Sequence, residues 1–415
     1  MAKTKGLRWW MWVAVVIVVL LVVGGVVIWW APWGTQQSAH VEKEEILFGG
    51  SCSITGQYSL PGERELWAVQ LWVDRVNAKG GIYVREYGKK LRVRYIFYDD
   101  KSDPTTAAKL YEKLITEDKI DFAVTPYSSS IGFAVTTICE KYGVPFVYTN
   151  CMSDSILARG YQHIYMVGVL ASRHGWGGIE MFNELGAKHI AIIAEKSEWS
   201  MMYAKGAYNR SLALGIPTVT YTEIEKECKD FTPLILKLKS ENPDVVYAVL
   251  YHAESMLLVK QMKELNYRPK AIWCALGPEE DSWRKALGST AEYIFGTLYY
   301  HHEWNTPGNK EFAEKFLERY GERPTHLAAC PYATLEVYQQ AIEKAGTLNY
   351  TAIEKVLRTT TFSTIYTANL TFLEFGYPAG TVVGCGQVIR GDFKPIWPPG
   401  WSSYKPTYPL PPEWP

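Results

Sequence analysis

The stretch that decides the fold is Ile46-Leu47-Phe48-Gly49-Gly50-Ser51-Cys52-Ser53-Ile54-Thr55-Gly56. Its first five residues form a short apolar run that ends in glycines, which is typical of a β-strand buried on both faces. The next six residues are small, uncharged and rich in hydroxyl groups. A buried strand followed by such a loop predicts a parallel sheet with polar loops at the carboxyl ends of its strands.

Strand-like and helix-like segments alternate through the rest of the chain. Further strands are expected at 91–98, 122–124, 145–148, 189–194, 245–250 and 271–275. Helices are expected at 63–77, 103–118, 128–142, 180–185, 231–240 and 254–265. This alternation predicts an α/β fold with mostly parallel sheets flanked by helices. About 350 residues beyond residue 45 are enough for two lobes.

Three polar loops follow strands and are candidates for a binding site. They are Ser51–Gly56, Tyr127–Ser130 and Thr149–Ser153. In open α/β sheets, ligands bind beyond the carboxyl ends of the strands. The loop at Tyr127–Ser130 also begins a helix, where free backbone N–H groups favour a carboxylate or another anion. An ordinary serine N-cap is the alternative interpretation.

The N-terminal segment predicts a membrane anchor. Lys3, Lys5 and Arg8 precede an uncharged apolar run from Trp9 to Trp30, which is long enough at about 1.5 Å per residue to cross a bilayer. Tryptophans lie at both ends of the run, and the basic residues lie on one side only. The prediction is a cytoplasmic stub at 1–8, a single span at 9–30, a linker at 31–44 and a soluble domain outside the cell.

Two other interpretations of this segment stay open. A secretory signal peptide would be cleaved, although its apolar core is usually shorter than this one. Lys5-Gly6-Leu7 also resembles the site that is cut in pilin-like archaeal leaders, and the helix would then remain attached.

Composition and motifs argue against several classes of function. The 43 basic and 43 acidic residues balance, so no nucleic-acid partner is expected. The seven cysteines form no CxxC pair, and the adjacent side chains of His301-His302-Glu303 point apart on a regular element, so no metal site is expected. The motifs of serine hydrolases, P-loop proteins, zinc proteases and dinucleotide-binding enzymes are missing. Neither enzyme activity nor a cofactor is therefore predicted.

Prolines and aromatic residues dominate the chain from residue 394 to residue 415. This composition predicts an extended or polyproline-like tail. Such a tail either wraps on the surface or lies loose. Its apolar rings could also dock on a partner or lie near the membrane.

Several short segments have a characteristic order and spacing. They are Asn77-Ala78-Lys79-Gly80-Gly81-Ile82, Tyr98-Asp99-Asp100 with Asp103-Pro104, Ala158-Arg159-Gly160-Tyr161-Gln162-His163, and Asp230-Phe231-Thr232. Together they resemble the branched-chain amino-acid-binding protein family, the substrate-binding receptors of one class of ABC importers. The resemblance covers about residues 45 to 395.

The resemblance implies a two-lobed periplasmic-binding-protein-like fold with three crossovers, which closes on its ligand by a hinge. Carried onto this chain, one lobe comprises 45–167 and 300–372, and the other comprises 168–299 and 373–393. The implied partners are a small ligand and the permease and ATPase subunits of an ABC importer. A receptor that senses amides or urea stays open, and an extracellular hydrolase is a third possibility.

The resemblance also implies a set of ligand-binding residues. They are Ser128, Ser129, Asn150, Cys151, Ser153, Trp199, Tyr251 and Glu279. Ser128, the first serine of its loop, corresponds to the residue that holds the ligand carboxylate. Asn150 and the residues after it correspond to a backbone carbonyl and a hydroxyl. Trp199 and Tyr251 correspond to aromatic residues of the second lobe.

Two positions depart from the family pattern. In an ungapped match, Met152 occupies the hydroxyl position that helps hold an α-ammonium, and Ser153 replaces it only with a one-residue shift. The family carboxylate that pairs with the ammonium falls near 275–276, and Glu279 fills that role only if the loop is longer. A buried ammonium without a carboxylate is costly. The ligand is therefore either a branched-chain or related amino acid, or an amide or aromatic acid without that ammonium.

Overall fold

The computed structural model describes residues 43–381, 383–399 and 404–414. The predicted stub, the predicted membrane span and all but the last two residues of the predicted linker lie outside the described residues. None of the helices in the described part is both long and apolar enough to span a membrane. The chain from Glu44 onward forms one compact unit, to which all elements named below belong.

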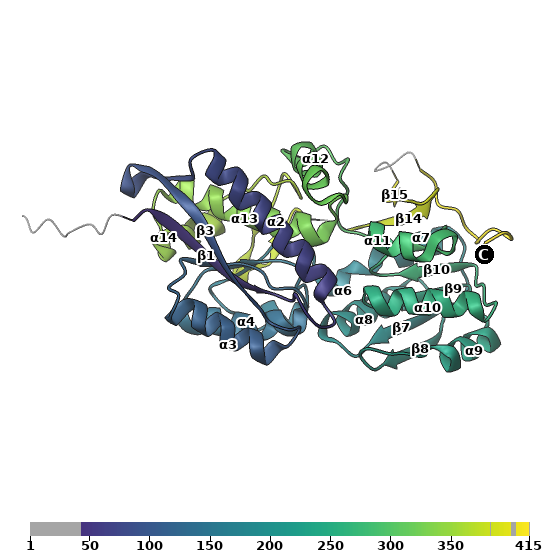
Figure 1. The fold of residues 1–415 in the computed structure, drawn as a ribbon. Helices are drawn as coiled ribbons and strands as arrows, with labels where there is room; N and C mark the ends of the chain where they lie inside the picture. Colours follow the sequence, from purple (N-terminus) through teal and green to yellow (C-terminus); the bar gives the residue numbers. More distant parts are fainter. Residues whose placement is uncertain (1–42, 382, 400–403, 415) are drawn as a thin grey trace, which may run out of the picture. The chain divides into compact units, whose positions relative to one another are not determined.

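One sheet has six strands in the order β2-β3-β1-β4-β5-β6 (Figure 1). Its strands are β1 (Glu45–Cys52), β2 (Ile82–Val84), β3 (Lys89–Asp99), β4 (Phe122–Ala123), β5 (Phe146–Tyr148) and β6 (Ile164–Met166). The central strand β1 pairs in parallel with β3 and β4, and β2 runs antiparallel to β3. The strand expected at 46–50 extends to Cys52, because its ladder with β3 continues to Asp99.

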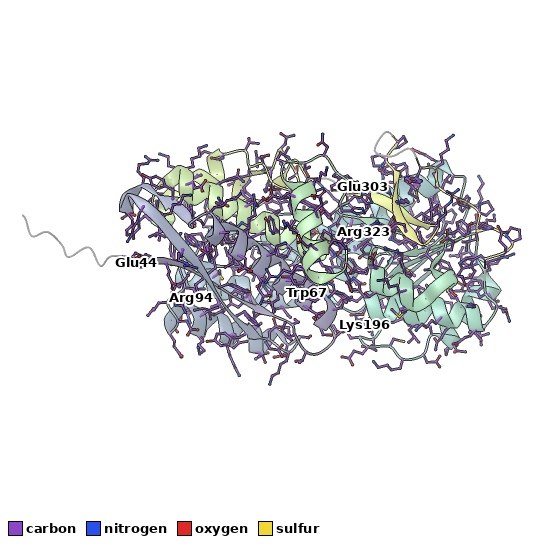
Figure 2. The ribbon with its side chains drawn as sticks, turned by 45° about the horizontal axis from the view of Figure 1, so that its top comes forward. Glu44, Trp67, Arg94, Lys196, Glu303 and Arg323 are labelled. Carbon is purple, nitrogen blue, oxygen red and sulfur yellow. The ribbon has the colours of Figure 1, made fainter. Side chains whose placement is uncertain are left out.

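Helices cover both faces of this sheet. They are α2 (Ser59–Ala78), α3 (Pro104–Thr116), α4 (Ser129–Tyr142) and α5 (Asp154–Leu157), joined from later in the chain by α12 (Asn309–Tyr320), α13 (His326–Ala345) and α14 (Tyr350–Thr359). Helix α2 packs against α13, and α3 packs against α4. Figure 1 shows these two pairs on opposite sides of β1 and β3. Trp67, which is labelled in Figure 2, belongs to α2. Its ring stacks on that of Tyr320 of α12 with centroids 4.5 Å apart.

The second sheet has seven strands in the order β15-β14-β11-β10-β9-β7-β8. Its strands are β7 (Ile190–Glu195), β8 (Thr218–Ile224), β9 (Val245–Val249), β10 (Ala271–Cys274), β11 (Phe295–Leu298), β14 (Gly384–Ile389) and β15 (Asp392–Trp397). Its helices are α6 (Ala171–His174), α7 (Trp176–Glu184), α8 (Glu198–Ala213), α9 (Thr232–Glu241), α10 (His252–Glu264) and α11 (Asp281–Leu287). Five strands are parallel, and β14 and β15 add an antiparallel edge.

Strand β7 explains why this sheet is covered on both faces. Ile190 and Ile192 pack into the core that includes residues of α7 and α8. The alternate residues Ala191 and Ile193 pack into a second core with residues of α9 and α10. Successive side chains of a strand point to opposite faces, so a continuous apolar strand requires helices on both sides.

The chain passes between the two sheets three times. It leaves the first sheet after β6, returns to it with α12, α13 and α14 after β11, and re-enters the second sheet at β14. A two-stranded sheet of β12 (Thr371–Phe372) and β13 (Pro378–Ala379) lies on the last passage. Within the described residues, three 3-10 helices complete the fold, at Arg85–Tyr87, Gly288–Ala291 and Glu374–Gly376.

The C-terminal segment differs from the extended tail expected from residue 394 onward. Residues 394–397 form the second part of β15, whose Pro395 lies opposite Gly386. Proline is tolerated there because β15 is an edge strand. Further on, Leu410 and Trp414 are buried in the core beside α9 and α10. The described part of the tail therefore wraps on its own domain.

Gly206 lets two helices of the second sheet approach closely. A Cβ atom at Gly206 would lie 1.8 Å from the backbone oxygen of Ser172. Helix α8 can therefore lie directly on α6 only with glycine at this position. This contact matters for the site, because α6 carries His174 and α8 carries Trp199.

Candidate functional site

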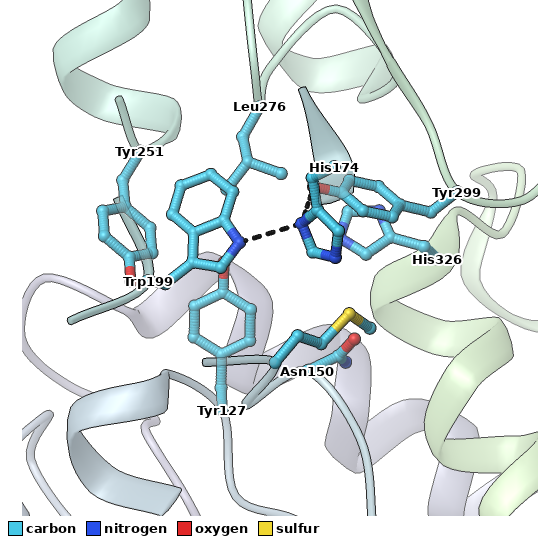
Figure 3. A pocket seen from close by; sticks show the side chains of 9 residues that line it. Tyr127, Asn150, His174, Trp199, Tyr251, Leu276, Tyr299 and His326 are labelled. Carbon is cyan, nitrogen blue, oxygen red and sulfur yellow. Dashed lines mark hydrogen bonds between the residues drawn. The ribbon is translucent and has the colours of Figure 1, made fainter. Parts of the chain in front are cut away.

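A cavity lies between the carboxyl ends of the two sheets (Figure 3). Its lining residues are Tyr127, Asn150, Met152, His174, Trp199, Tyr251, Leu276, Tyr299 and His326. Its empty space is about 310 Å³, counting the mouth. This is the position at which open α/β sheets bind ligands.

The loops after four parallel strands supply much of the wall. Tyr127 follows β4, and Asn150 and Met152 follow β5. On the other side, Tyr251 follows β9 and Leu276 follows β10. Both sheets therefore present residues from their carboxyl ends to the same cavity.

The remaining wall is built around the buried ring of His174. Trp199 donates from Nε1 to His174 Nδ1 at 3.2 Å, and the Tyr299 hydroxyl lies 2.9 Å from the same nitrogen. The opposite nitrogen, Nε2, lies 2.6 Å from the carbonyl oxygen of Val169. Burial lowers the pKa of His174 to about 4, so the ring is neutral near pH 7 and carries its proton on Nε2.

A cluster of tyrosines closes one end of the cavity. The rings of Tyr58 and Tyr127, from the side of the first sheet, pack on Tyr251 with centroids 5.1 Å and 6.2 Å away. Trp199, from the side of the second sheet, also packs on Tyr251, with ring centroids 5.2 Å apart. The aromatic wall thus spans both lobes.

Ser128 lies next to this wall, at the start of α4. It is the N-cap residue, yet its side chain makes no capping hydrogen bond. Its hydroxyl oxygen is buried and has no hydrogen-bond partner among the described residues. An ordinary serine N-cap therefore does not explain this side chain, although the backbone position is that of a cap.

These features have counterparts among known proteins. Residues 45–392 match the model of a family described as "Periplasmic binding protein", which is well over half of the chain. The chain belongs to the periplasmic binding protein family.

Similar proteins confirm the two-lobed α/β fold predicted for this periplasmic binding protein. It is 24% identical over 337 residues to Leu/Ile/Val-binding protein homolog 7 of Brucella abortus, covering 78% of this chain and 83% of the relative. The leucine binding protein LivK from Thermotoga maritima matches with a TM-score of 0.76 and 22% identity, covering 85% and 98% of the two chains. A solute binding protein of an ABC transporter from R. palustris, solved with benzoate, matches with a TM-score of 0.75 and 17% identity, covering 85% and 95%.

The cavity of this periplasmic binding protein includes three of the residues expected in its site. Asn150, Trp199 and Tyr251 line it. Asn150 is held in place because its side-chain amide donates to Glu65 Oε1 at 2.8 Å. Its carbonyl oxygen Oδ1 is buried and has no partner among the described residues.

The other five expected residues lie beside the cavity rather than in its wall. They are Ser128, Ser129, Cys151, Ser153 and Glu279. The Cys151 thiol donates to the carbonyl oxygen of Pro126 at 2.9 Å. The Ser129 hydroxyl accepts from the backbone N–H of Ser153 at 3.0 Å. Their roles in binding stay predictions.

Ser153 makes a contact between the lobes that the sequence does not indicate. Its hydroxyl lies 3.0 Å from Glu198 Oε1, to which it donates. Ser155 donates to the same oxygen. Both serines belong to the side of the first sheet, and Glu198 begins α8 on the second. A carboxylate that receives two hydroxyl donors across the lobes links them beside the cavity.

Four residues of the cavity wall are neither among the eight expected ligand-binding residues nor at the two positions that depart from the family pattern. They are Tyr127, His174, Tyr299 and His326. Tyr127 and Tyr299 lie in the loops that follow β4 and β11, and a residue in such a loop can be recognised in the sequence as a candidate for the site. His174 and His326 belong to helices α6 and α13 that follow crossovers, where no strand-end pattern marks them.

Proposed function

We propose that this chain is a solute-binding receptor of an ABC importer and that its cavity binds a small carboxylate without an α-ammonium group. Met152 and Leu276 carry this proposal. Both line the cavity, and both side chains are apolar. In the family resemblance, Met152 occupies the hydroxyl position in an ungapped match, and Leu276 lies near the position of the carboxylate that pairs with an α-ammonium.

Glu279 offers no ready substitute for that carboxylate. It is not among the residues that line the cavity. Its Oε2 accepts from the backbone N–H of Gly277 at 2.9 Å, and its Oε1 faces His252 and His326. An ammonium buried between Met152 and Leu276 would have no anionic partner, and burying an unpaired charge is costly.

The start of α4 is suited to the ligand's carboxylate. The first N–H groups of a helix have no partner within the helix and favour an anion. The buried hydroxyl of Ser128 has a free donor at this position, because no described group accepts from it. Tyr127, the residue before it, lines the cavity.

The lining of the cavity favours an aromatic ligand. Tyr127, Trp199, Tyr251 and Tyr299 contribute aromatic rings. Aromatic rings pack well on one another in stacked or edge-to-face geometry. The structural neighbour from R. palustris was solved with benzoate, which is a flat carboxylate without an ammonium.

A stability titration tests this function. Full-length protein would be unfolded thermally with benzoate, 4-hydroxybenzoate, benzamide, urea or leucine present. A ligand at about 100 times its Kd adds roughly 2.7 kcal/mol of stability. We expect that shift with an aromatic carboxylate. A shift with leucine and none with the aromatic acids would overturn the proposal.

The importer partnership and the membrane anchor belong to the same proposal. Residues 9–30 would hold the chain at the outer face of the membrane, where a permease can receive the ligand. Cross-linking in native membranes should recover permease and ATPase subunits with the chain. Recovery of a sensor kinase in their place would favour the signalling receptor.

A further inference from the structure

Four buried side chains with metal-binding atoms meet beside the cavity. His252 is the first residue of α10, and Glu279 and Glu280 lie in the loop between β10 and α11. One ligand atom from each of these three residues lies within 4.8 Å of the others. His326, the first residue of α13, faces the same group from the side of the first sheet. All four side chains are at least nine-tenths buried.

The distances within this group are too long for hydrogen bonds. His252 Nε2 lies 3.6 Å from Glu279 Oε1, and His326 Nδ1 lies 3.9 Å from the same oxygen. A hydrogen bond between nitrogen and oxygen needs about 2.7–3.2 Å. His252 Nε2 and Glu279 Oε1 are both buried, and neither has a hydrogen-bond partner among the described residues. Two orphaned polar atoms facing each other in the interior require an explanation.

A shared metal ion explains this spacing. Zinc binds imidazole nitrogen and carboxylate oxygen at about 2.0–2.2 Å, so neighbouring ligand atoms in a tetrahedral site lie roughly 3.3–3.6 Å apart. The observed 3.6 Å between His252 Nε2 and Glu279 Oε1 matches that spacing. A pair held by direct contact would be closer together.

We propose that His252, Glu279 and Glu280 bind one divalent transition-metal ion of the zinc class, while His326 faces the Glu279 carboxylate from the other lobe. An imidazole ligand suits zinc better than calcium or magnesium, which take oxygen ligands. Glu280 supplies a second carboxylate, whose Oε1 accepts a hydrogen bond from Thr325. A cation also compensates the charge of a buried carboxylate, which is costly without a partner.

The ion would lie where the two lobes meet. His252 and Glu279 belong to the second sheet, whereas α13, which carries His326, packs on α2 and β5 of the first. His326 also lines the cavity, so an ion could enter from there. This site does not depend on the nature of the cavity's ligand.

The sequence gives no motif for this site, because its ligands come from two distant segments of the chain, at 252 and at 279–280. The described residues also hold another group of histidines beside an acid, His301, His302 and Glu303. Glu303 is 66% exposed there and lies 3.8–3.9 Å from the two rings. That group provides a matched control for non-specific binding by histidine.

Zinc binding by the untagged full-length protein tests the proposal. ZnCl₂ would be titrated against a chromophoric chelator for the wild type and for His252→Gln, Glu279→Gln and the control His302→Gln. We expect one Zn²⁺ per chain, bound at least about 100-fold more weakly by the first two variants, since even an outer-shell partner costs about 10–100-fold. The control should match the wild type. Absence of stoichiometric binding, or an equal loss in the control, overturns the proposal.

X-ray absorption on the zinc-loaded wild type keeps the test independent of whether the variants fold. One imidazole nitrogen and carboxylate oxygens at about 2.0–2.2 Å are expected. A spectrum without imidazole ligands overturns the proposal even if zinc binds. Because the titration contains no organic ligand, failure here leaves the carboxylate-binding function untouched, and failure of that function leaves the metal site untouched.

Discussion

The indole Nε1 of Trp199 donates a hydrogen bond to Nδ1 of His174 across 3.2 Å (Figure 3). The bond joins α8 to α6, and it holds the indole at the cavity wall. His174 can accept because its proton lies on Nε2, which donates to the carbonyl oxygen of Val169. One neutral imidazole therefore orients a residue expected to contact the ligand.

Replacing His174→Phe should destabilise the fold. The ring shape is kept, but Trp199 Nε1 and the carbonyl oxygen of Val169 both lose a buried partner. Each unsatisfied group costs about 1–3 kcal/mol. Chemical denaturation should give a lower free energy of unfolding than for the control His189→Phe, whose histidine is exposed. Equal stability of the two variants would mean that the hydrogen bonds of His174 contribute nothing.

Replacing Ser128→Ala should weaken ligand binding. If the Ser128 hydroxyl donates to the ligand's carboxylate, its loss should cost about 1–3 kcal/mol of binding free energy. Calorimetry with the aromatic acid that gives the largest stability shift measures this cost. Ser130→Ala serves as the control, since Ser130 lies in the same helix turn and is half-buried. An unchanged Kd for Ser128→Ala would remove Ser128 from the site.

Glu195 should make stability depend on pH. Burial, followed by the nearby Glu254 carboxylate, raises the pKa of Glu195 to about 7. Its pKa in the unfolded chain is about 4.3. Between these values the folded state holds the proton and the unfolded state does not, so the contribution of Glu195 to stability falls as the pH rises.

Glu195→Gln isolates this effect. The variant cannot ionise at this position, so its stability relative to the wild type should increase by roughly 3 kcal/mol between about pH 4.5 and pH 8. Denaturation at several pH values measures the difference. Glu225→Gln, at an exposed carboxylate, should show no such trend. A constant difference between Glu195→Gln and the wild type would contradict the raised pKa.

Glu198→Ala should weaken binding without altering the cavity wall. Glu198 does not line the cavity, but it accepts from Ser153 and Ser155 across the lobes. Loss of about 1 kcal/mol of contact between the lobes raises the Kd about fivefold. The exposed Glu225→Ala is the control. A Kd equal to that of the control would mean that this contact does not stabilise the ligand-bound arrangement of the two lobes.

The sequence predicted most of the fold because local patterns determine it. The apolar run of β7 and the start of α4 after Ser128 depend on residues close together in the chain. The exact ends shift by a few residues where tertiary contacts extend an element. Helix α2, for example, begins at Ser59 and not at residue 63.

The site was harder to predict because its residues meet through crossovers. Met152 and Leu276 lie directly after strands, and the family resemblance pointed to both positions. His174 and His326 reach the same cavity from helices that follow passages between the sheets. The family resemblance predicted Glu279 as a ligand-binding residue, but its Oε1 faces two histidines that are distant in the chain. No local pattern contains such contacts.

Binding of matched acids tests the central claim most directly. Leucine and 4-methylpentanoate differ only by the α-ammonium, as do phenylalanine and 3-phenylpropanoate. Calorimetry on the wild type should give Kd values at least about tenfold lower for the acid without the ammonium, because Met152 and Leu276 leave that charge unpaired. Equal or tighter binding of leucine and phenylalanine would contradict the claim and would mean that an acid in the site reaches the ammonium.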